Sequence, residues 1–325
     1  MGERAFLDWL RQQTTGRDRV LLGLGDDAAA VAWGAGPPCL VTTDMLLEGS
    51  CFTLVGRPIQ VPGVEPATPR RVGRKAMSVN LSDLAAMAAV PVAAVVSVGL
   101  PRDGGRALAQ ELYLGLKDQA EAFGVALVGG DTNSWDGPVT LSVTLFGEPG
   151  PGGIIRRSGA KLGDWLLVTG PLGGSIHGKH LDFTPRIHEA LELVKKTHVN
   201  AMIDLSDGLA IDLARLCSES GCGAVLWAEA LPISQAVTSR AASRTPQDHA
   251  LHQGRSPLDH ALNDGEDFEL LLAVDAAEAR RLIREQPIAG ITLSAIGEVV
   301  SSGLWLQQQG QRVALPRGGH EHRLD

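Results

Sequence analysis

Aspartates recur where apolar segments of this 325-residue chain end, and these residues could do chemistry. The pair Asp26 and Asp27 stands in "GLGDDAA", an otherwise small and apolar stretch. Burying a charged side chain is costly, so acids in such surroundings need an explanation. Taken singly, each has a simple one, because Asp after a strand is most often a turn former or a helix cap. The other acids in comparable positions are Asp44, Asp83, Asp131, Asp204, Asp207, Asp264, Glu266 and Asp267.

As a set, these acids indicate a shared metal site. Two carboxylates about 4 Å apart repel each other by roughly 4 kcal/mol at an effective dielectric constant near ~20, so several could converge only around cations. Hard oxygen ligands of this kind, with the hydroxyls of Thr42 and Thr43 alongside, suit Mg²⁺. Mg²⁺ bound by carboxylates normally serves phosphate oxygens. We therefore expect several magnesium ions to stand between the aspartates and a polyphosphate.

Familiar motifs of other nucleotide and metal enzymes do not fit the chain. It has no G-x-x-x-x-G-K-[ST] motif, which excludes a P-loop protein. "GLGDDA" matches a dinucleotide fingerprint only loosely, and its acids would face the pyrophosphate. No H-E-x-x-H motif or Cys/His cluster indicates zinc, and no Ser-His-Asp arrangement follows from the spacing. We interpret His177 and His180 as surface or hydrogen-bonded residues.

Alternating strand-like and helix-like segments must position these acids, which predicts a mixed α/β (α+β) protein. In the first half the pattern predicts strands over 39–47, 92–100, 125–131 and 139–147, and helices over 70–89 and 104–124. The turn-rich "GEPGPGG" at 147–153 is the best candidate for a domain boundary. We expect an N-terminal domain of 1–150 and a C-terminal domain of 151–325.

The second half restarts with a strand over 163–170 and continues with strands over 268–274 and 291–300. A helix is predicted over 207–220, with Ser206 or Asp207 as its N-cap. The segment 234–257 is rich in Ser, Arg, Gln and His, which predicts a surface excursion.

Composition excludes several classes of protein. The net charge of −8 and the absence of a basic tail argue against a nucleic-acid binder, and an aromatic content of 4% argues against base-stacking surfaces. The four cysteines show no disulfide-framework spacing. We find no signal-peptide core at the N-terminus and no apolar run long enough to span a bilayer. We expect a cytoplasmic protein with no membrane partner.

Seven motifs occur in the order seen in one known family. They are "GLGDDAA", "TTDMLLEG", "GRKAMSVNLSDLAAMAAVP", "LVGGDT", "RRSGAKLGDWLLVTG", "IDLSDGL" and "GEDFELL". Through them the chain resembles the thiamine-monophosphate kinase family, within the superfamily of aminoimidazole ribonucleotide synthetase and selenophosphate synthetase. The resemblance implies the two-domain aminoimidazole ribonucleotide synthetase-like fold. In that fold the N-terminal sheet pairs with its twin in a homodimer, and ATP binds where it meets the C-terminal mixed α/β domain.

The resemblance also implies roles for individual residues. Positions that match Mg²⁺ ligands are Asp27, Thr42, Thr43, Asp44, Asp83, Asp131, Asp204 and Asp207. Positions that match residues around ATP are Gly130, Asp131, Arg157 and Ser206. The substrate positions are Cys51, Glu266 and His320; Cys51 stands where the family usually has His, and His320 where it usually has a larger aromatic residue. Ala88 replaces a usual Gly, a change that we attribute to packing.

The function implied is ATP-dependent phosphorylation of thiamine monophosphate to thiamine diphosphate. The second pKa of a phosphate monoester is near ~6, so the acceptor oxygen is largely ionised at neutral pH and needs no general base. Arg157 and Mg²⁺ would screen the charges during direct in-line transfer. Two alternatives stay open. One is another ATP-using enzyme of the superfamily that acts on a different phosphorylated acceptor; the other is a non-catalytic nucleotide sensor, suggested by the changes at Cys51 and His320.

Overall fold

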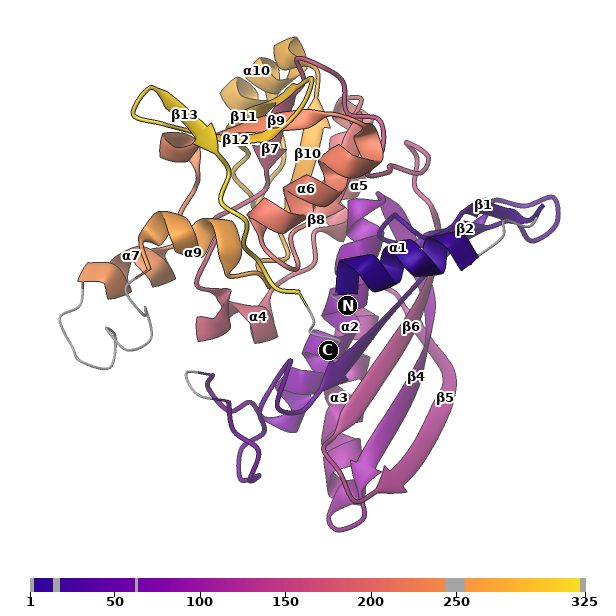
Figure 1. Ribbon diagram of the computed structural model, residues 1–325. Coiled ribbons are helices and arrows are strands. Elements are labelled where there is room, and N and C mark those ends of the chain that lie inside the picture. Colours follow the sequence, from indigo (N-terminus) through magenta and orange to yellow (C-terminus); the bar gives the residue numbers. More distant parts are fainter. Residues whose placement is uncertain (1–2, 14–17, 62–63, 243–254, 322–325) are drawn as a thin grey trace.

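The structure is a computed structural model that describes residues 3–13, 18–61, 64–242 and 255–321 (Figure 1). The N-terminal half consists of α1 (Glu3–Gln13), β1 (Val20–Leu22), β2 (Ala29–Val31), β3 (Cys39–Leu47), α2 (Pro69–Ala86), β4 (Ala89–Pro101), α3 (Gly105–Ala122), β5 (Ala126–Trp135) and β6 (Thr140–Pro149). The C-terminal half begins with β7 (Trp165–Val168), η1 (Ser175–His177), α4 (Lys179–Asp182), α5 (Ile187–Lys196), β8 (Ala201–Asp204), α6 (Leu209–Ser220) and β9 (Gly223–Trp227). It ends with η2 (Ala228–Ala230), α7 (Gln235–Ala242), α9 (Pro257–Asn263), β10 (Leu270–Val274), α10 (Ala276–Glu285), β11 (Ser294–Val300), β12 (Leu304–Gln308) and β13 (Gln311–Ala314).

The first sheet has the strand order β1-β2-β3-β6-β4-β5, with β5 as an edge strand. Helices α2 and α3 cover one face, and the other face over β4, β5 and β6 is open in Figure 1. The two helices approach closely because Gly73 and Gly115 lie at their contact. A Cβ atom on Gly73 would lie 2.0 Å from the Leu112 carbonyl oxygen, and one on Gly115 would lie 1.8 Å from the Arg70 carbonyl oxygen.

The second sheet has the strand order β13-β12-β9-β11-β7-β10-β8, with β12 parallel to β9 and the other neighbours antiparallel. Strand β8 lies at the edge that approaches α2, so the last residue of β8 comes close to the N-terminal half. The two halves share one buried apolar cluster, which includes Leu84 on α2, Met202 on β8 and Phe268. This shared core fixes the position of the two halves relative to each other.

Helix α2 begins at a side-chain N-cap and is followed by a residue with a left-handed backbone. Thr68 accepts a hydrogen bond from the Arg71 backbone N–H, and Pro69 occupies the first helical position. Ala88, just after the helix, has φ of +50° and is fully buried. Our attribution of this position to packing is therefore incomplete, because a left-handed backbone is the conformation that glycine adopts at no steric cost.

The predicted cap of α6 is wrong. Gly208 is the N-cap, and neither Ser206 nor Asp207 caps the helix through its side chain. Instead, Asp212 inside the helix reaches back: its Oδ2 accepts hydrogen bonds from the backbone N–H groups of Asp207 and Gly208, both at 3.0 Å. This arrangement leaves the Asp207 carboxylate available for other partners.

The predicted surface excursion over 234–257 contains helical structure at both ends. It includes α7, and its last residue opens α9, where Ser256 and Asp259 form a capping box. Residues 243–254 lie outside the described part of the chain. Among the described helices, none has the length and apolar character needed to cross a membrane.

Candidate active site

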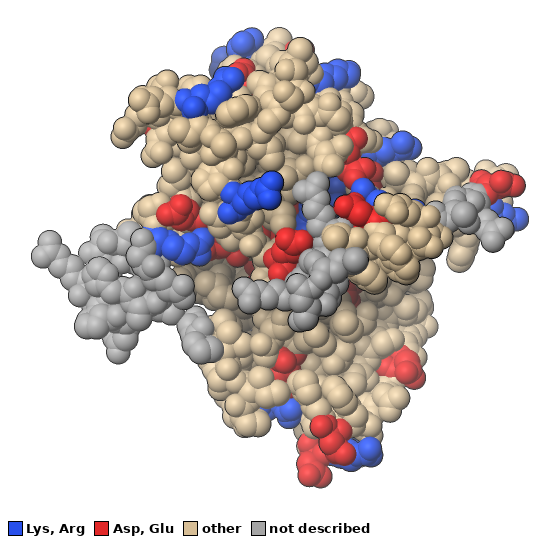
Figure 2. All heavy atoms as spheres, viewed as in Figure 1, with Lys and Arg blue, Asp and Glu red and all other residues tan. Residues whose placement is uncertain are grey.

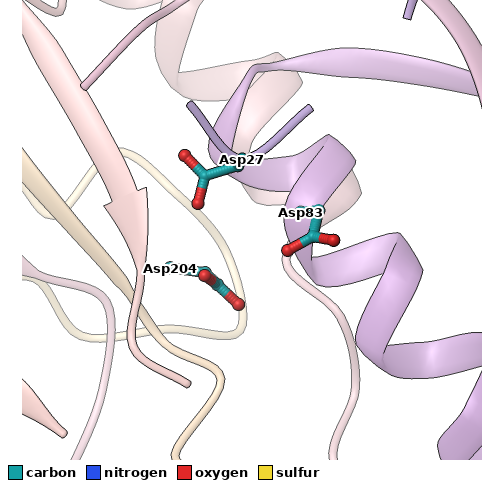
Figure 3. Close-up of side chains that lie close together, drawn as sticks. All are labelled: Asp27, Asp83 and Asp204. Carbon is teal, nitrogen blue, oxygen red and sulfur yellow. The ribbon is translucent and has the colours of Figure 1, made fainter. Parts of the chain in front are cut away.

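Three aspartates from distant segments meet between the two halves. Asp27 follows the first short strand, Asp83 lies on α2, and Asp204 is the last residue of β8. One carboxylate oxygen from each lies within 4.8 Å of the others, and Figure 3 shows the three side chains around a common space. Asp27 and Asp204 are buried and Asp83 is half-buried. The sequence-based prediction that these acids converge agrees with this arrangement.

The electrostatics of this three-aspartate cluster favour a cation. Burial raises the pKa of Asp83 well above its usual range, and the neighbouring charges of Asp44, Asp204 and Asp27 raise it further. Burial, followed by the charge of Asp27, raises the pKa of Asp204 in the same way. Such carboxylates hold protons when no metal is bound, and an ion that replaces the protons removes the repulsion. The set of hard oxygen ligands therefore fits Mg²⁺.

The alternation of side chains along β3 divides the predicted ligands on this strand into two groups, one on each face of the sheet. Thr42 and Asp44 lie on the α2 side of β3: Thr42 Oγ1 donates a hydrogen bond to Asp83 Oδ2, and Asp44 is hydrogen-bonded to Asp83. Burial, the largest effect, raises the pKa of Asp44 to about 6. Thr43 is exposed on the opposite face, where its Oγ1 donates to the Val143 carbonyl oxygen at 3.1 Å. Thr42 and Asp44 therefore adjoin the cluster, whereas Thr43 does not.

Gly130 and Asp131 also lie away from the cluster. They are on the exposed edge strand β5, where Asp131 pairs with Ser97 of β4. A side chain at Gly130 would collide with β4, because its Cβ atom would lie 1.8 Å from the Val96 carbonyl oxygen. Within one chain the structure does not bring these two residues to the aspartates.

Arg157 adjoins the three-aspartate cluster and pairs with one member. Its Nε and Nη2 donate to Asp27 Oδ2 and Oδ1 at 3.1 and 2.9 Å, and its backbone N–H donates to Asp26 Oδ1 at 2.6 Å. Burial, the largest effect, raises the pKa of Asp26 to about 6. Arg157, which the resemblance places near ATP, therefore lies at the acidic site and contacts both aspartates of the "GDD" motif.

The loop between β8 and α6 carries the remaining predicted residues. Ser206 and Asp207 are half-buried there, and Asp207 Oδ2 accepts a hydrogen bond from Arg215 Nη1. Arg215 Nη1 also donates to Asp212 Oδ1 at 2.7 Å. The sequence analysis missed Arg215 and Asp212. Their i, i+3 spacing on a predicted helix was the available signal, since residues with that spacing lie on one helix face.

The three predicted substrate residues surround this same loop. The Glu266 backbone N–H donates to the Ser206 carbonyl oxygen at 2.6 Å, and the His320 backbone N–H donates to the Asp207 carbonyl oxygen at 2.9 Å. Cys51 is linked through Lys75, whose Nζ donates to the Cys51 carbonyl oxygen at 2.9 Å and also to Glu266 Oε1. Lys75 was not identified from the sequence.

His180 also belongs to this region. His180 is fully buried, so it is not a surface residue. Its Nδ1 lies 3.0 Å from Glu266 Oε2, so the alternative interpretation, a hydrogen-bonded residue, applies to that nitrogen. His177, by contrast, is half-buried.

A cavity of about 590 Å³ opens beside the cluster, between α1, α6 and residues 315–321. Four arginines line it, of which Arg157 and Arg215 also contact site aspartates; the other two are Arg11 and Arg317. Figure 2 shows acidic and basic side chains together along the band where the two halves meet. An anionic ligand placed there would contact Arg157 and Arg215, which in turn pair with Asp27 and Asp207.

Comparison with known proteins gives consistent matches over the whole chain. A family model described as the AIR synthase related protein N-terminal domain matches residues 25–148, and the corresponding C-terminal domain matches residues 169–304. A thiamine-monophosphate kinase of Rhodopirellula baltica is 39% identical over 313 residues, which are 93% of this chain and 91% of that protein. The same enzyme of Caulobacter vibrioides is 32% identical over 96% of this chain and 88% of its own length.

Solved structures agree in fold. A structure described as AaThiL complexed with AMPPCP and TMP superposes with a TM-score of 0.79 and 27% identity, covering 99% of this chain and 97% of that one. Thiamine monophosphate kinase from Aquifex aeolicus superposes with a TM-score of 0.75 and 26% identity, over 97% and 100% of the two chains. Hydrogenase maturation protein HypE of Escherichia coli, at 18% identity and a TM-score of 0.66, shares the fold.

Proposed function

We infer the function from one premise: this chain belongs to the thiamine-monophosphate kinase family, among the AIR synthase related proteins. It is an enzyme that uses ATP to phosphorylate thiamine monophosphate to thiamine diphosphate. The single observation in the molecule that carries this conclusion is the three-aspartate cluster beside Arg157. A different phosphorylated acceptor, or a sensor without catalysis, would leave the match to these kinases over nearly the full length without an explanation.

Asp27, Asp83 and Asp204 are proposed to hold Mg²⁺, with Thr42 and Asp44 adjoining them. Asp207 is proposed as a further ligand because it stands three residues after Asp204 in the same loop. Bound magnesium supplies charge screening between the two phosphates that must meet. Without a cation, the folded protein disfavours the ionised forms of Asp83 and Asp204, whose pKa values are raised.

Arg157 and Ser206 are proposed to act at the ATP phosphates. Arg157 provides a guanidinium with planar donor geometry, which suits phosphate oxygens, and Ser206 provides a hydroxyl in the half-buried loop after β8. The arginine-lined cavity beside them has room for the nucleoside part of ATP. The acceptor phosphate is already ionised at neutral pH, so no side chain has to remove a proton and direct in-line transfer is sufficient.

Glu266, Cys51 and His320 are proposed to contact thiamine monophosphate around the loop after β8; His320 stands between Gly319 and Glu321, which line the arginine-lined cavity. His320 presents an imidazole that can stack on a flat heterocycle, although with less area than Trp or Tyr. Cys51 supplies a thiol, which is only a weak hydrogen-bond donor. Glu266 is therefore proposed as the main polar contact of the acceptor.

A homodimer is proposed because part of the predicted site faces away from the cluster. The residues on the open face or edge of the first sheet are Gly130, Asp131 and Thr43. In a dimer, these residues of one copy could approach the aspartates of the other copy. That face also exposes apolar side chains, including Met45 and Val128. Figure 2 shows few charged side chains over this part of the molecule in that view. Large apolar side chains exposed on an open sheet face support the proposed interface.

The proposed domains are residues 1–150 and 151–325. The two sheets support the division, since β6 ends at Pro149 and β7 begins at Trp165. The cytoplasm is proposed as the compartment because ATP is available there, and all four cysteines are free thiols.

The function is tested by offering the purified protein ATP and Mg²⁺ with a panel of acceptors: thiamine monophosphate, thiamine and unrelated phosphomonoesters. Thiamine diphosphate from thiamine monophosphate, with no product from the other acceptors, is expected. Preferential phosphorylation of another monoester would contradict the proposal.

A further inference from the structure

Lys75 is fully buried near the middle of α2, with no exposed side-chain surface. A buried ammonium group loses its hydration, and well-packed apolar residues often replace such buried charges without loss of stability. Met would fill a similar volume without that cost. The charge at this position therefore calls for an explanation other than packing.

The Lys75 ammonium group faces three partners. Its Nζ lies 2.5 Å from Glu266 Oε1, 2.9 Å from the Cys51 carbonyl oxygen and 3.1 Å from His180 Nδ1. Two of these partners, Cys51 and Glu266, are proposed substrate contacts. Lys75 therefore joins two loop residues of the acceptor region to one helix.

His180 completes the arrangement from the C-terminal half. It lies on α4, and its Nδ1 is 3.0 Å from Glu266 Oε2; with the proton on Nδ1 the ring donates to that oxygen and does not accept from the neighbouring Lys75, so lysine and histidine each hold one oxygen of the same carboxylate. Its Nε2 is buried and has no hydrogen-bond partner among the described residues. An unpaired buried nitrogen destabilises a fold, which again indicates that function retains the residue.

The backbone of Glu266 is also unusual. Its φ is +54°, in the left-handed region that non-glycine residues rarely adopt, and its N–H is fixed to the Ser206 carbonyl oxygen. Strained residues of this kind are concentrated at functional sites. Lys75 is eight residues before Asp83 on the same helix, or about 12 Å along its axis, which leaves room for an organic acceptor between Glu266 and the metal-binding acids.

We propose that Lys75 and His180 are positioning residues, which hold the Glu266 carboxylate at two points so that it can recognise thiamine monophosphate. The inference rests on the proposed function and on Glu266 as an acceptor contact. Lys75 and His180 act through Glu266, so they determine the affinity for the acceptor and leave the nucleotide end unchanged.

The test is a comparison of KM values for the two substrates in the full-length variants Lys75→Met and His180→Phe. Each is expected to raise KM for thiamine monophosphate at least tenfold and to change KM for ATP less than twofold. In a Glu266→Gln background, the same substitutions are expected to add little further increase, because their effect passes through the carboxylate. Lys75→Arg, which keeps the cation, is expected to recover part of the loss.

The matched control is Lys179→Met, one residue before His180. It removes a lysine from another buried carboxylate, Glu269, at 2.8 Å, and it is expected to leave both KM values unchanged. Wild-type protein that forms no thiamine diphosphate would overturn the proposed function and this inference with it. Active wild-type protein whose Lys75 and His180 variants fail to fold, or keep a normal KM for thiamine monophosphate, would overturn the inference alone.

Discussion

The Arg157 guanidinium and the Asp27 carboxylate form a two-point ion pair, with Nε to Oδ2 at 3.1 Å and Nη2 to Oδ1 at 2.9 Å. One oxygen of this carboxylate also belongs to the group within 4.8 Å of Asp83 and Asp204. The Arg157 guanidinium therefore lies where the proposed metal site and an incoming polyphosphate would meet. Its planar geometry matters, because the ammonium group of lysine cannot present two parallel N–H groups to the two carboxylate oxygens.

Arg157→Lys is therefore expected to lower kcat by about 10-fold to 100-fold, although the charge is kept. Arg157→Met leaves Asp27 without its partner in an acidic cluster, and is expected to destabilise the metal-free protein by about 3 kcal/mol. Steady-state kinetics and urea unfolding check the two effects. Wild-type kcat in the lysine variant would show that two-point geometry is unimportant.

Asp83→Asn is expected to lower kcat by about 100-fold or more, because metal binding to charged ligands contributes several kcal/mol to phosphoryl transfer. The metal-free variant is expected to unfold at the same temperature as the wild type or higher, since burial and the neighbouring aspartates disfavour a charge on Asp83 there and the Asn amide carries none. Thermal unfolding with and without Mg²⁺ separates these effects. A variant that is unstable in the absence of metal and gains as much from Mg²⁺ as the wild type would contradict the metal assignment.

The metal-free protein is expected to lose stability as pH rises from about 4 to about 7. Burial raises the pKa of Asp26 and Asp267 to about 6 and that of Asp212 to about 7. In that range the folded chain holds protons that the unfolded chain has released, so the free energy of unfolding falls as pH rises through the folded pKa values.

Mg²⁺ binds only the ionised carboxylates, so its stabilising effect is expected to be larger at pH 8 than at pH 5. Unfolding temperatures in EDTA and in Mg²⁺ at several pH values between 5 and 8 measure both trends. A Mg²⁺ effect that is the same at both ends of the range would be inconsistent with this explanation.

Ser97→Arg is expected to separate the proposed homodimer and to abolish activity, because Ser97 is exposed on the open sheet face beside Asp131. Light scattering gives the oligomeric state, and the same sample gives the activity. Tyr113→Arg on α3, 52% exposed and on a helix of the other layer, serves as the control and should remain a dimer. A fully active monomer would refute the proposal that Asp131 acts across the interface.

Much of the fold could be predicted from local patterns. Strand β3 coincides with the predicted 39–47, and Gly124 with φ of +69° follows α3 as expected. The cap of α6 was mispredicted because Ser and Asp before a helix usually cap it, whereas here Gly208 is the N-cap and Asp212 within the helix accepts from the backbone N–H groups of Asp207 and Gly208. Such a reversal depends on side-chain geometry that spacing does not encode.

The candidate site was predictable in part for similar reasons. Aspartates at the ends of apolar segments indicated a convergent acidic site, and three of them meet. Successive side chains of a strand point to opposite faces, so the predicted strand over 39–47 already implies that Thr42 and Thr43 separate. Which of the two residues faces Asp83 depends on tertiary packing, which local patterns do not encode. Lys75 and His180 were not recognised because they are 105 residues apart and meet only through tertiary packing.

The most direct test of the central claim measures ADP and thiamine diphosphate together in one reaction with γ-labelled ATP and thiamine monophosphate. With Mg²⁺, wild-type protein is predicted to form the two products in equal amounts, to carry no label itself, and to form neither product in excess EDTA. Thiamine diphosphate that forms equally well in EDTA, or label trapped on the protein as a kinetically competent intermediate, would contradict magnesium-dependent direct transfer at the three aspartates.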